Sequence, residues 1–68
     1  MKIKYFPDTD TALIVFGDRE IAETREINEN IYIDLDKNGK LVSMTIEHAR
    51  ELTSIKGISY EEVGVDSK

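Results

Sequence analysis

The sequence predicts an α+β domain in which an antiparallel β-meander of about five strands carries one short C-terminal helix packed on one face. Three observations support this fold class. From Lys2 to Glu47, apolar and polar residues largely alternate between clusters of turn residues, as they do in strands. From His48 the apolar residues recur every three positions, as on a helix. Finally, alternating runs flank Asn38-Gly39, a dipeptide that favours a β-hairpin.

The first two strands are expected at residues 2–6 and 11–16. Pro7-Asp8-Thr9-Asp10 between them has the composition of a tight turn, with the aspartates bonded to nearby backbone amides. Residues 11–16 are apolar on both faces, so this strand is expected in the interior of the sheet with both faces covered. Because one short helix covers one face, the other needs the C-terminal segment or a second copy of the chain.

The remaining strands are expected at residues 20–27, 31–36 and 40–47. The first of them carries mixed charges, which indicates an edge or near-edge strand. Asn28-Glu29-Asn30 turns the chain into the second, and Asn38-Gly39 joins the second to the third. The inward-facing residues of the last two strands are Ile31, Ile33, Leu35, Val42, Met44 and Ile46.

The helix is expected over residues 48–56, with Ala49, Leu52 and Ile55 on its apolar stripe and Gly57 as its C-terminal cap. Residues 1–57 would then form a single compact β-rich domain. Residues 58–68 are expected to form a C-terminal segment that docks partly through apolar side chains and frays at its end. These side chains are Ile58, Tyr60 and Val63.

Charge and composition narrow the classes of function. The 68 residues include 9 basic and 14 acidic ones, for a net charge of −5. No Lys/Arg cluster could neutralise a row of phosphates, so direct nucleic-acid binding is disfavoured and a basic protein partner is favoured. The chain has no cysteine and no apolar run long enough for a signal peptide or membrane span. We expect a cytoplasmic protein that binds a protein partner or forms a homodimer, without membrane contact.

The segment around Asn38-Gly39 also resembles the first half of an EF-hand calcium loop. Asp34, Asp36, Asn38 and Gly39 would occupy loop positions 1, 3, 5 and 6. Position 12, which needs a bidentate glutamate, is Thr45, and the segment follows a strand instead of a helix. A tight turn is therefore favoured and no metal site is expected, with a calcium- or metal-binding protein as the alternative.

His48 is the one histidine of the chain, with Glu47 and Glu51 as its nearest carboxylates. These three residues are the alternative catalytic site, that of a small enzyme. A lone histidine between a strand and a helix is more often a capping or surface residue, and no nucleophile elbow, phosphate-binding loop or cofactor fingerprint is present. We therefore expect no enzymatic activity and no cofactor.

The expected function is that of a non-enzymatic protein-interaction module. The outward positions of the fourth strand and the polar positions of the third would together form a negatively charged interaction surface. Its residues are Tyr32, Asp34, Asp36, Glu23 and Glu26.

Three segments, taken in order, resemble one prokaryotic family. They are Tyr5-Phe6-Pro7-Asp8-Thr9-Asp10-Thr11-Ala12-Leu13, the acidic Glu20-Ile21-Ala22-Glu23-Thr24-Arg25-Glu26, and Ile33-Asp34-Leu35-Asp36 followed by Gly39 and Leu41-Val42. The family is domain of unknown function 2283, and the resemblance covers residues 5–52.

The resemblance implies a small bacterial or archaeal protein with a compact β-rich fold, no established activity and no catalytic residues. Some members are similar to antitoxins in being short, acidic and encoded beside small toxin-like proteins. The resemblance therefore suggests an antitoxin-like partner of a small basic protein. The chain departs from the family pattern by its longer tail after Gly57.

Overall fold

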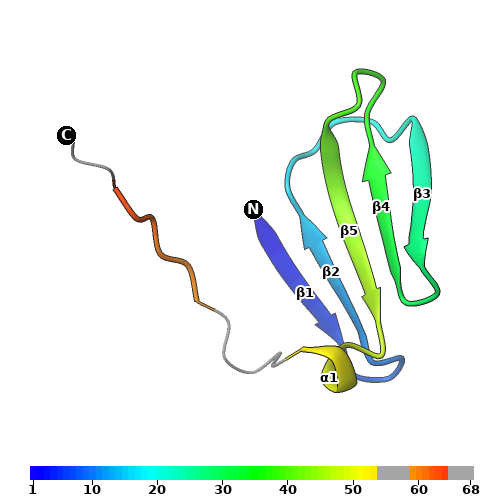
Figure 1. Ribbon diagram of the computed structural model, residues 1–68, viewed down its shortest axis with the longest axis vertical. Coiled ribbons are helices and arrows are strands. Elements are labelled where there is room, and N and C mark those ends of the chain that lie inside the picture. Colours follow the sequence, from blue (N-terminus) through cyan, green and yellow to red (C-terminus); the bar gives the residue numbers. More distant parts are fainter. Residues whose placement is uncertain (54–58, 65–68) are drawn as a thin grey trace.

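The computed structural model describes residues 1–53 and 59–64 of the chain. Within these residues, five strands are followed by one short helix (Figure 1). The strands are β1 (Lys2–Phe6), β2 (Thr11–Val15), β3 (Glu23–Asn28), β4 (Ile31–Leu35) and β5 (Leu41–Glu47), and the helix is α1 (Ala49–Leu52). The predicted α+β class, with five antiparallel strands and a short C-terminal helix, is confirmed.

The strand order is β1-β2-β5-β4-β3, so the predicted meander is wrong: β2 pairs with β5 instead of β3. The connecting segment 16–22 makes this order possible. Its seven residues can span about 24 Å, whereas the three strand spacings from β2 to β3 amount to about 14 Å. The segment crosses the end of the β4–β5 hairpin (Figure 1), and the apolar β2 strand gains a neighbour on each side, as its composition requires.

Local chemistry sets the turns. The Thr9 N–H donates to the Phe6 carbonyl over 3.3 Å, which places Pro7 at the second position of the turn, where its fixed φ fits. In the β4–β5 turn, Gly39 has a positive φ of 82° and Asn38 does not, whereas the common two-residue Asn-Gly turn has a positive φ at both residues. Hydrogen bonds from Gly39 N–H to Asp36 O and from Asp36 N–H to Lys40 O instead fit a type I turn followed by a left-handed glycine.

Helix α1 is shorter than the predicted 48–56 because Thr53 ends it. The Thr53 N–H and hydroxyl both donate to the Ala49 carbonyl over 2.8 Å, and the Thr53 backbone is extended. Ile55 and Gly57 lie outside the described residues. Ala49 is fully buried, whereas Leu52 is 49% exposed. The predicted apolar stripe is therefore fully buried at Ala49 and only half-buried at Leu52.

The register divides the sheet into two faces, because residues opposite each other on paired strands share a face. The apolar face has a first row across four strands and a second row beside it. The first row is Ile3, Ile14, Met44 and Ile33, and the second is Tyr5, Ala12, Ile46 and Ile31. The opposite, polar face carries Thr24, Asp34 and Ser43 in one row and Glu26, Tyr32 and Thr45 in the next.

Helix α1 covers the apolar face at the end of its second row. The Arg50 guanidinium lies 5.3 Å from the centroid of the Tyr5 ring, and the Ala49 N–H donates to the Asp10 carbonyl over 2.9 Å. The core is thin, and no large side chain among the described residues is fully buried. Its buried apolar residues are Ala12, Leu35, Val42 and Ala49.

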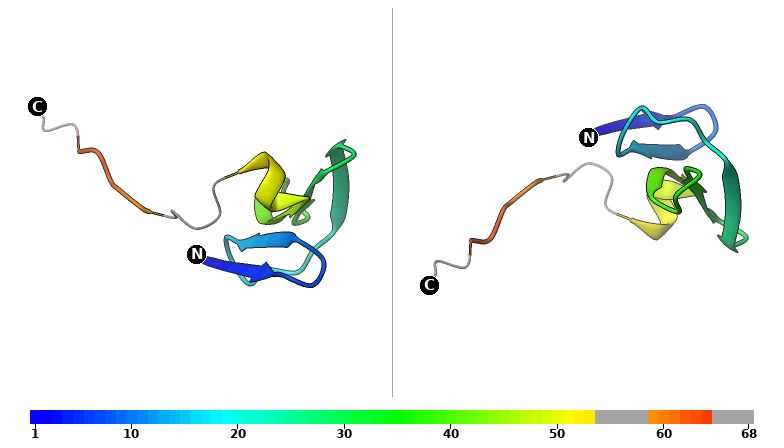
Figure 2. Two further views of the ribbon diagram at one scale, coloured as in Figure 1. Left: turned by 90° about the horizontal axis from the view of Figure 1, so that it is seen from below. Right: turned by 90° about the horizontal axis from the view of Figure 1, so that it is seen from above.

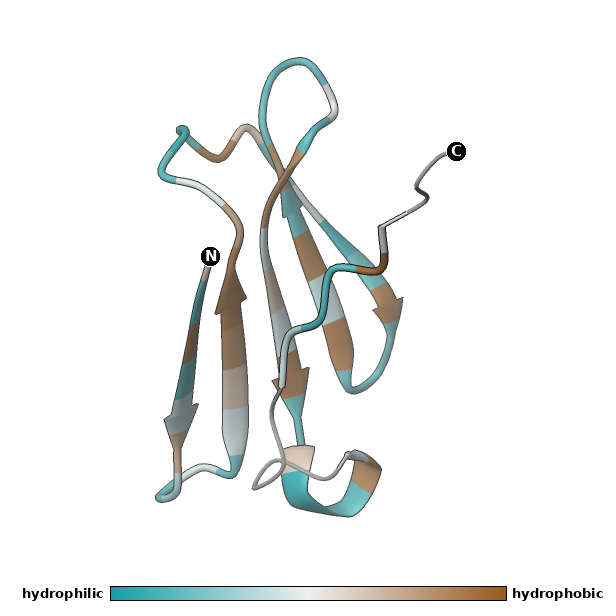
Figure 3. Ribbon diagram, turned by 90° about the vertical axis from the view of Figure 1, so that its left-hand side faces the viewer, coloured by the Kyte–Doolittle hydropathy of each residue, from teal (hydrophilic) through white to brown (hydrophobic). Residues whose placement is uncertain are grey.

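The sheet is strongly twisted, and the end views show β3 turned well away from the β1–β2 hairpin (Figure 2). Apolar residues form bands along β2, β4 and β5 (Figure 3). Residues 59–64 lead away from the sheet (Figures 1 and 2). Tyr60 and Val63 are 81% and 78% exposed, and Tyr60 lines a shallow hollow with Met1 and Ile3. Ile58 lies outside the described residues, and the docking of the C-terminal segment stays a prediction.

Candidate functional site

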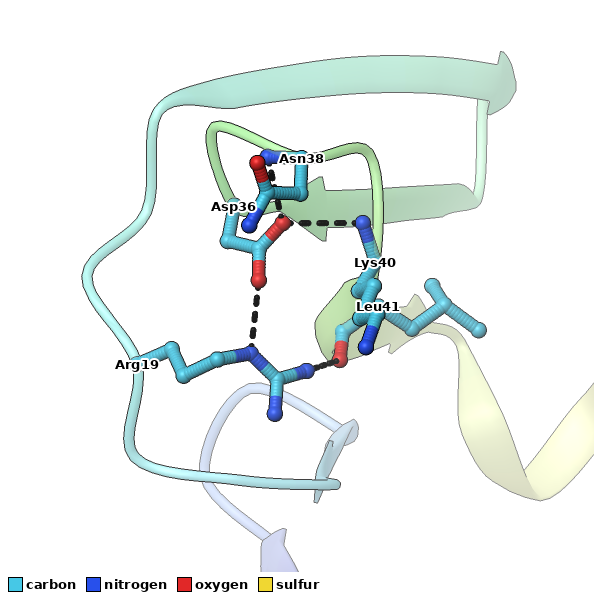
Figure 4. Close-up of polar contacts among 5 residues, drawn as sticks. All are labelled: Arg19, Asp36, Asn38, Lys40 and Leu41. Atoms are coloured by element: carbon cyan, nitrogen blue, oxygen red, sulfur yellow. Dashed lines mark hydrogen bonds and ion pairs between the residues drawn. The ribbon is translucent and has the colours of Figure 1, made fainter.

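The β4–β5 turn is built around Asp36 (Figure 4). Its Oδ1 accepts the backbone N–H of Asn38 at 2.8 Å and of Lys40 at 2.9 Å. Its Oδ2 lies 2.7 Å from Nε of Arg19, which belongs to the connecting segment 16–22. Arg19 Nη2 also donates to the Leu41 carbonyl over 2.7 Å. Asp36 therefore ties the turn to the segment that crosses it.

These contacts correct the prediction that Asp36 points outward into an interaction surface. Its side chain is 6% exposed. Hydrogen bonds from the Lys40 and Asn38 amides, and then the Arg19 guanidinium, hold the pKa of the Asp36 carboxyl below its usual 3.8 against the opposing effect of burial. Strand β4 ends at Leu35, so the alternation that predicted an outward side chain no longer applies at the next residue.

Asp34 is engaged on the polar face. It accepts hydrogen bonds from the hydroxyls of Thr24, over 2.6 Å, and Ser43, which joins β3, β4 and β5 through side chains. The carboxylates of Asp34 and Asp36 thus have different partners, unlike two ligands of one calcium ion. Among residues 1–53 and 59–64, no three acidic or histidine side chains are grouped to hold a metal ion.

Tyr32 lies among carboxylates. The charge of Glu26, then burial and the charges of Glu47 and Glu29, raise the pKa of the Tyr32 phenol above its usual 10.0. Glu26 is directly opposite Tyr32 in the register. We call these four residues the acidic patch. The structure therefore brings Tyr32 and Glu26 of the predicted surface together, with Asp34 in the adjacent row of the polar face.

Glu23 lies on the other side of β3 from Glu26, opposite Leu35. Its Oε2 is 2.7 Å from Nε of Arg25, and both side chains are more than half exposed. The hydrogen bond from Arg25, followed by the charge of Arg25, lowers the pKa of the Glu23 carboxyl. The five predicted surface residues are thus divided between two faces, and Asp36 is buried.

Asp10 joins the first turn to α1. It has a φ of 55°, and its Oδ1 accepts the Tyr5 hydroxyl at 2.6 Å and the Arg50 N–H at 3.1 Å. The hydrogen bond from Tyr5 is the main cause of a lowered pKa at Asp10. The predicted bonding of the Asp10 side chain to nearby turn amides is therefore wrong, because its partners come from β1 and α1.

His48 lies on the surface immediately before α1, with a φ of 57°. Its Nδ1 is 2.8 Å from Oδ1 of Asn30, and the Glu47 N–H donates to the Asn30 carbonyl over 2.7 Å. Glu51 is exposed. Among the described contacts, the His48 ring thus meets a neutral amide and neither of the two glutamates named with it.

The comparisons with known proteins identify the chain at family level. A family model for proteins of unknown function, DUF2283, matches residues 2–50. The chain belongs to this family. The family predicted from the sequence is thereby confirmed, and the match spans all five strands and the start of α1. No curated protein and no solved structure matches this DUF2283 protein significantly.

In this DUF2283 protein, sequence reasoning missed the groups that complete the contacts above. Arg19 lies in a connection, and no local pattern relates it to Asp36. Ser43 stands between apolar neighbours, and Thr24 meets Asp34 only through the β3–β4 register.

In the described part of the chain, no helix has the length and apolar character to cross a membrane.

Proposed function

We propose that this DUF2283 protein is a non-enzymatic protein-interaction module, the antitoxin-like partner of a small basic protein. The first row of the apolar face carries this proposal. Ile3, Ile14, Met44 and Ile33 lie side by side across four strands and are half-buried or exposed. Apolar area removed from water contributes about 25 cal/mol per Å², so a partner's apolar side chains would bind here favourably.

The charge of the chain supports a basic partner. The net charge is −5, and three glutamates surround Tyr32 in the acidic patch. This patch lies on the polar face, opposite the first apolar row. It therefore acts on a partner bound at the apolar row by long-range attraction and not by direct contact. Such attraction raises the association rate and weakens with salt.

Two substitutions on β5 test which face binds. Met44 lies in the first row of the apolar face, and Thr45 is its neighbour on the polar face, so Met44→Lys and Thr45→Lys add the same charge to opposite faces. We would purify each tagged protein from its native cells at low salt and identify co-purifying proteins by mass spectrometry. A small basic protein should accompany the wild type and Thr45→Lys but not Met44→Lys.

Circular dichroism of both variants confirms that each is folded. Isolation of the wild type without a basic protein, or equal recovery with Met44→Lys, would contradict the proposal.

A further inference from the structure

The exposed edge of β3 is self-complementary. From Ile21 to Ile27 the sequence reads I-A-E-T-R-E-I. About its central Thr24, Ile21 corresponds to Ile27 and Glu23 to Arg25. We propose that two copies of this chain associate through β3, antiparallel, about a twofold axis at Thr24, to form one continuous sheet. This inference is independent of the proposed binding of a basic protein.

Strand β3 is available for such pairing. It lies at the edge of the sheet with β4 on one side, and all six of its residues are exposed. Every second residue of an edge strand directs its N–H and C=O groups away from the sheet, where another strand can pair with them. Ile21 and Ile27, which flank the charged centre, are 50% and 56% exposed.

The twofold axis at Thr24 brings complementary side chains together. Glu23 lies opposite Arg25 of the partner subunit, and Arg25 opposite Glu23 of the partner subunit. Opposite charges facing each other across antiparallel strands are stabilising. Ile21 precedes β3 and Ile27 lies at the register shift of the strand, so the paired segment is the charged centre of β3.

Three other registers of β3 bring like charges together. An axis at Glu23, Arg25 or Glu26 sets that charged residue opposite its own copy, which is destabilising. The other sheet edge, β1, is protected in the same way. An axis at Lys4 faces two copies of Lys4, and an axis at Ile3 faces Lys2 with Lys4 of the partner subunit. Charge complementarity therefore favours the axis at Thr24 over axes at the three charged residues of β3.

The contact is small. Pairing of one short strand from each copy falls at the low end of protein–protein interfaces, below about 1,200 Å². We therefore expect a monomer–dimer equilibrium that depends on protein concentration, measurable by sedimentation velocity.

Charge reversal tests the pairing itself. Glu23→Arg places arginine at both positions 23 and 25, and Arg25→Glu places glutamate at both, so each variant alone should stay monomeric. Mixed one to one, they should form a heterodimer, because every arginine then faces a glutamate. Circular dichroism checks that each variant is folded, and recovery on mixing shows that lost dimerisation is not unfolding.

A cysteine at the axis tests the register. The chain has no cysteine, and residues opposite each other in an antiparallel pair have Cα atoms about 4.5–5.5 Å apart, within the range that a disulfide spans. Under mild oxidation Thr24→Cys should form a disulfide-linked dimer much faster than Lys4→Cys at the other edge.

A wild-type protein that stays monomeric at about 1 mM, singly reversed variants that do not combine on mixing, or equal cross-linking at Lys4→Cys would each overturn this inference. Met44→Lys serves to separate the two proposals, since it lies on the apolar face and should leave the dimer intact.

Discussion

Arg19 and Asp36 form an ion pair of 2.7 Å that holds the connecting segment 16–22 against the β4–β5 hairpin. Arg19→Met keeps an unbranched apolar stem and removes both the ion pair and the hydrogen bond to the Leu41 carbonyl. The nearby Ala22 N–H, bonded to the Leu35 carbonyl over 2.8 Å, should then exchange with solvent about fivefold faster, since a partly exposed ion pair contributes at most about 1 kcal/mol.

Native-state hydrogen exchange measured by NMR provides the check on this prediction. The Glu47 amide, bonded to Asn30 at the other end of the sheet, is the internal control and should be unchanged. An unaltered exchange rate at Ala22 would show that the ion pair does not hold the segment.

Stability should decline in acid. The pKa values of Asp36 and Asp10 lie below their usual 3.8 in the folded protein, chiefly because of hydrogen bonds from the Lys40 amide and the Tyr5 hydroxyl respectively. The unfolded chain therefore takes up protons at a higher pH than the folded one. The stabilisation by these carboxylates is complete above pH 3.8 and is lost as the pH falls through the folded-state values.

Urea unfolding followed by circular dichroism at several pH values measures this decline. Asp36→Asn should lower the midpoint at neutral pH, because the amide carries no charge for Arg19, and should flatten the decline in acid. An acid decline as steep in Asp36→Asn as in the wild type would exclude Asp36 as a source.

Gly39→Ala should destabilise the protein through its backbone alone. Gly39 has a φ of 82°, and a Cβ built there meets no atom within 4 Å, so steric contact adds nothing. The left-handed conformation costs a residue with a Cβ about 1–2 kcal/mol, which urea unfolding would reveal. Gly64→Ala, also in open surroundings and in an exposed segment, is the control and should have no measurable effect.

Ala49→Leu should destabilise the contact between α1 and the sheet. Ala49 is fully buried, and added methyl groups in a packed site cost about 1–3 kcal/mol. Leu52→Ala, at a site 49% exposed, changes the same helix with a smaller effect. Thermal unfolding compares the two variants, and an equal or larger loss for Leu52→Ala would mean that the helix is held through Leu52 instead.

The parts of the fold that the sequence predicts are those decided by neighbouring residues. Pro7 defines the first turn and Asn38-Gly39 the position of the last, since turn chemistry acts over four or five residues. The edge position of β3 also follows from its own charges. The type of the last turn does not follow from the local sequence, because Asp36 lies beyond the end of β4 and its side chain pairs with Arg19.

The parts that the sequence does not predict join residues far apart in the chain. Consecutive strands are neighbours in roughly two-thirds of cases, and this preference favours a meander. The β2–β5 pairing breaks it, although the two-sided apolarity of β2 correctly indicated an interior strand. The same limit applies to Asp10, whose partner Arg50 lies in α1, and to the division of the predicted acidic surface between two faces.

The central position of β5 has a consequence for how the chain folds. Before residue 47 is synthesised, β1–β2 is an isolated hairpin, and two-stranded hairpins are at best marginally stable in water. The last strand to be made is thus the one that unites the sheet. Its long-range pairing with β2 should set the folding rate, and until it forms the apolar strand β2 is exposed to aggregation or to capture by a chaperone.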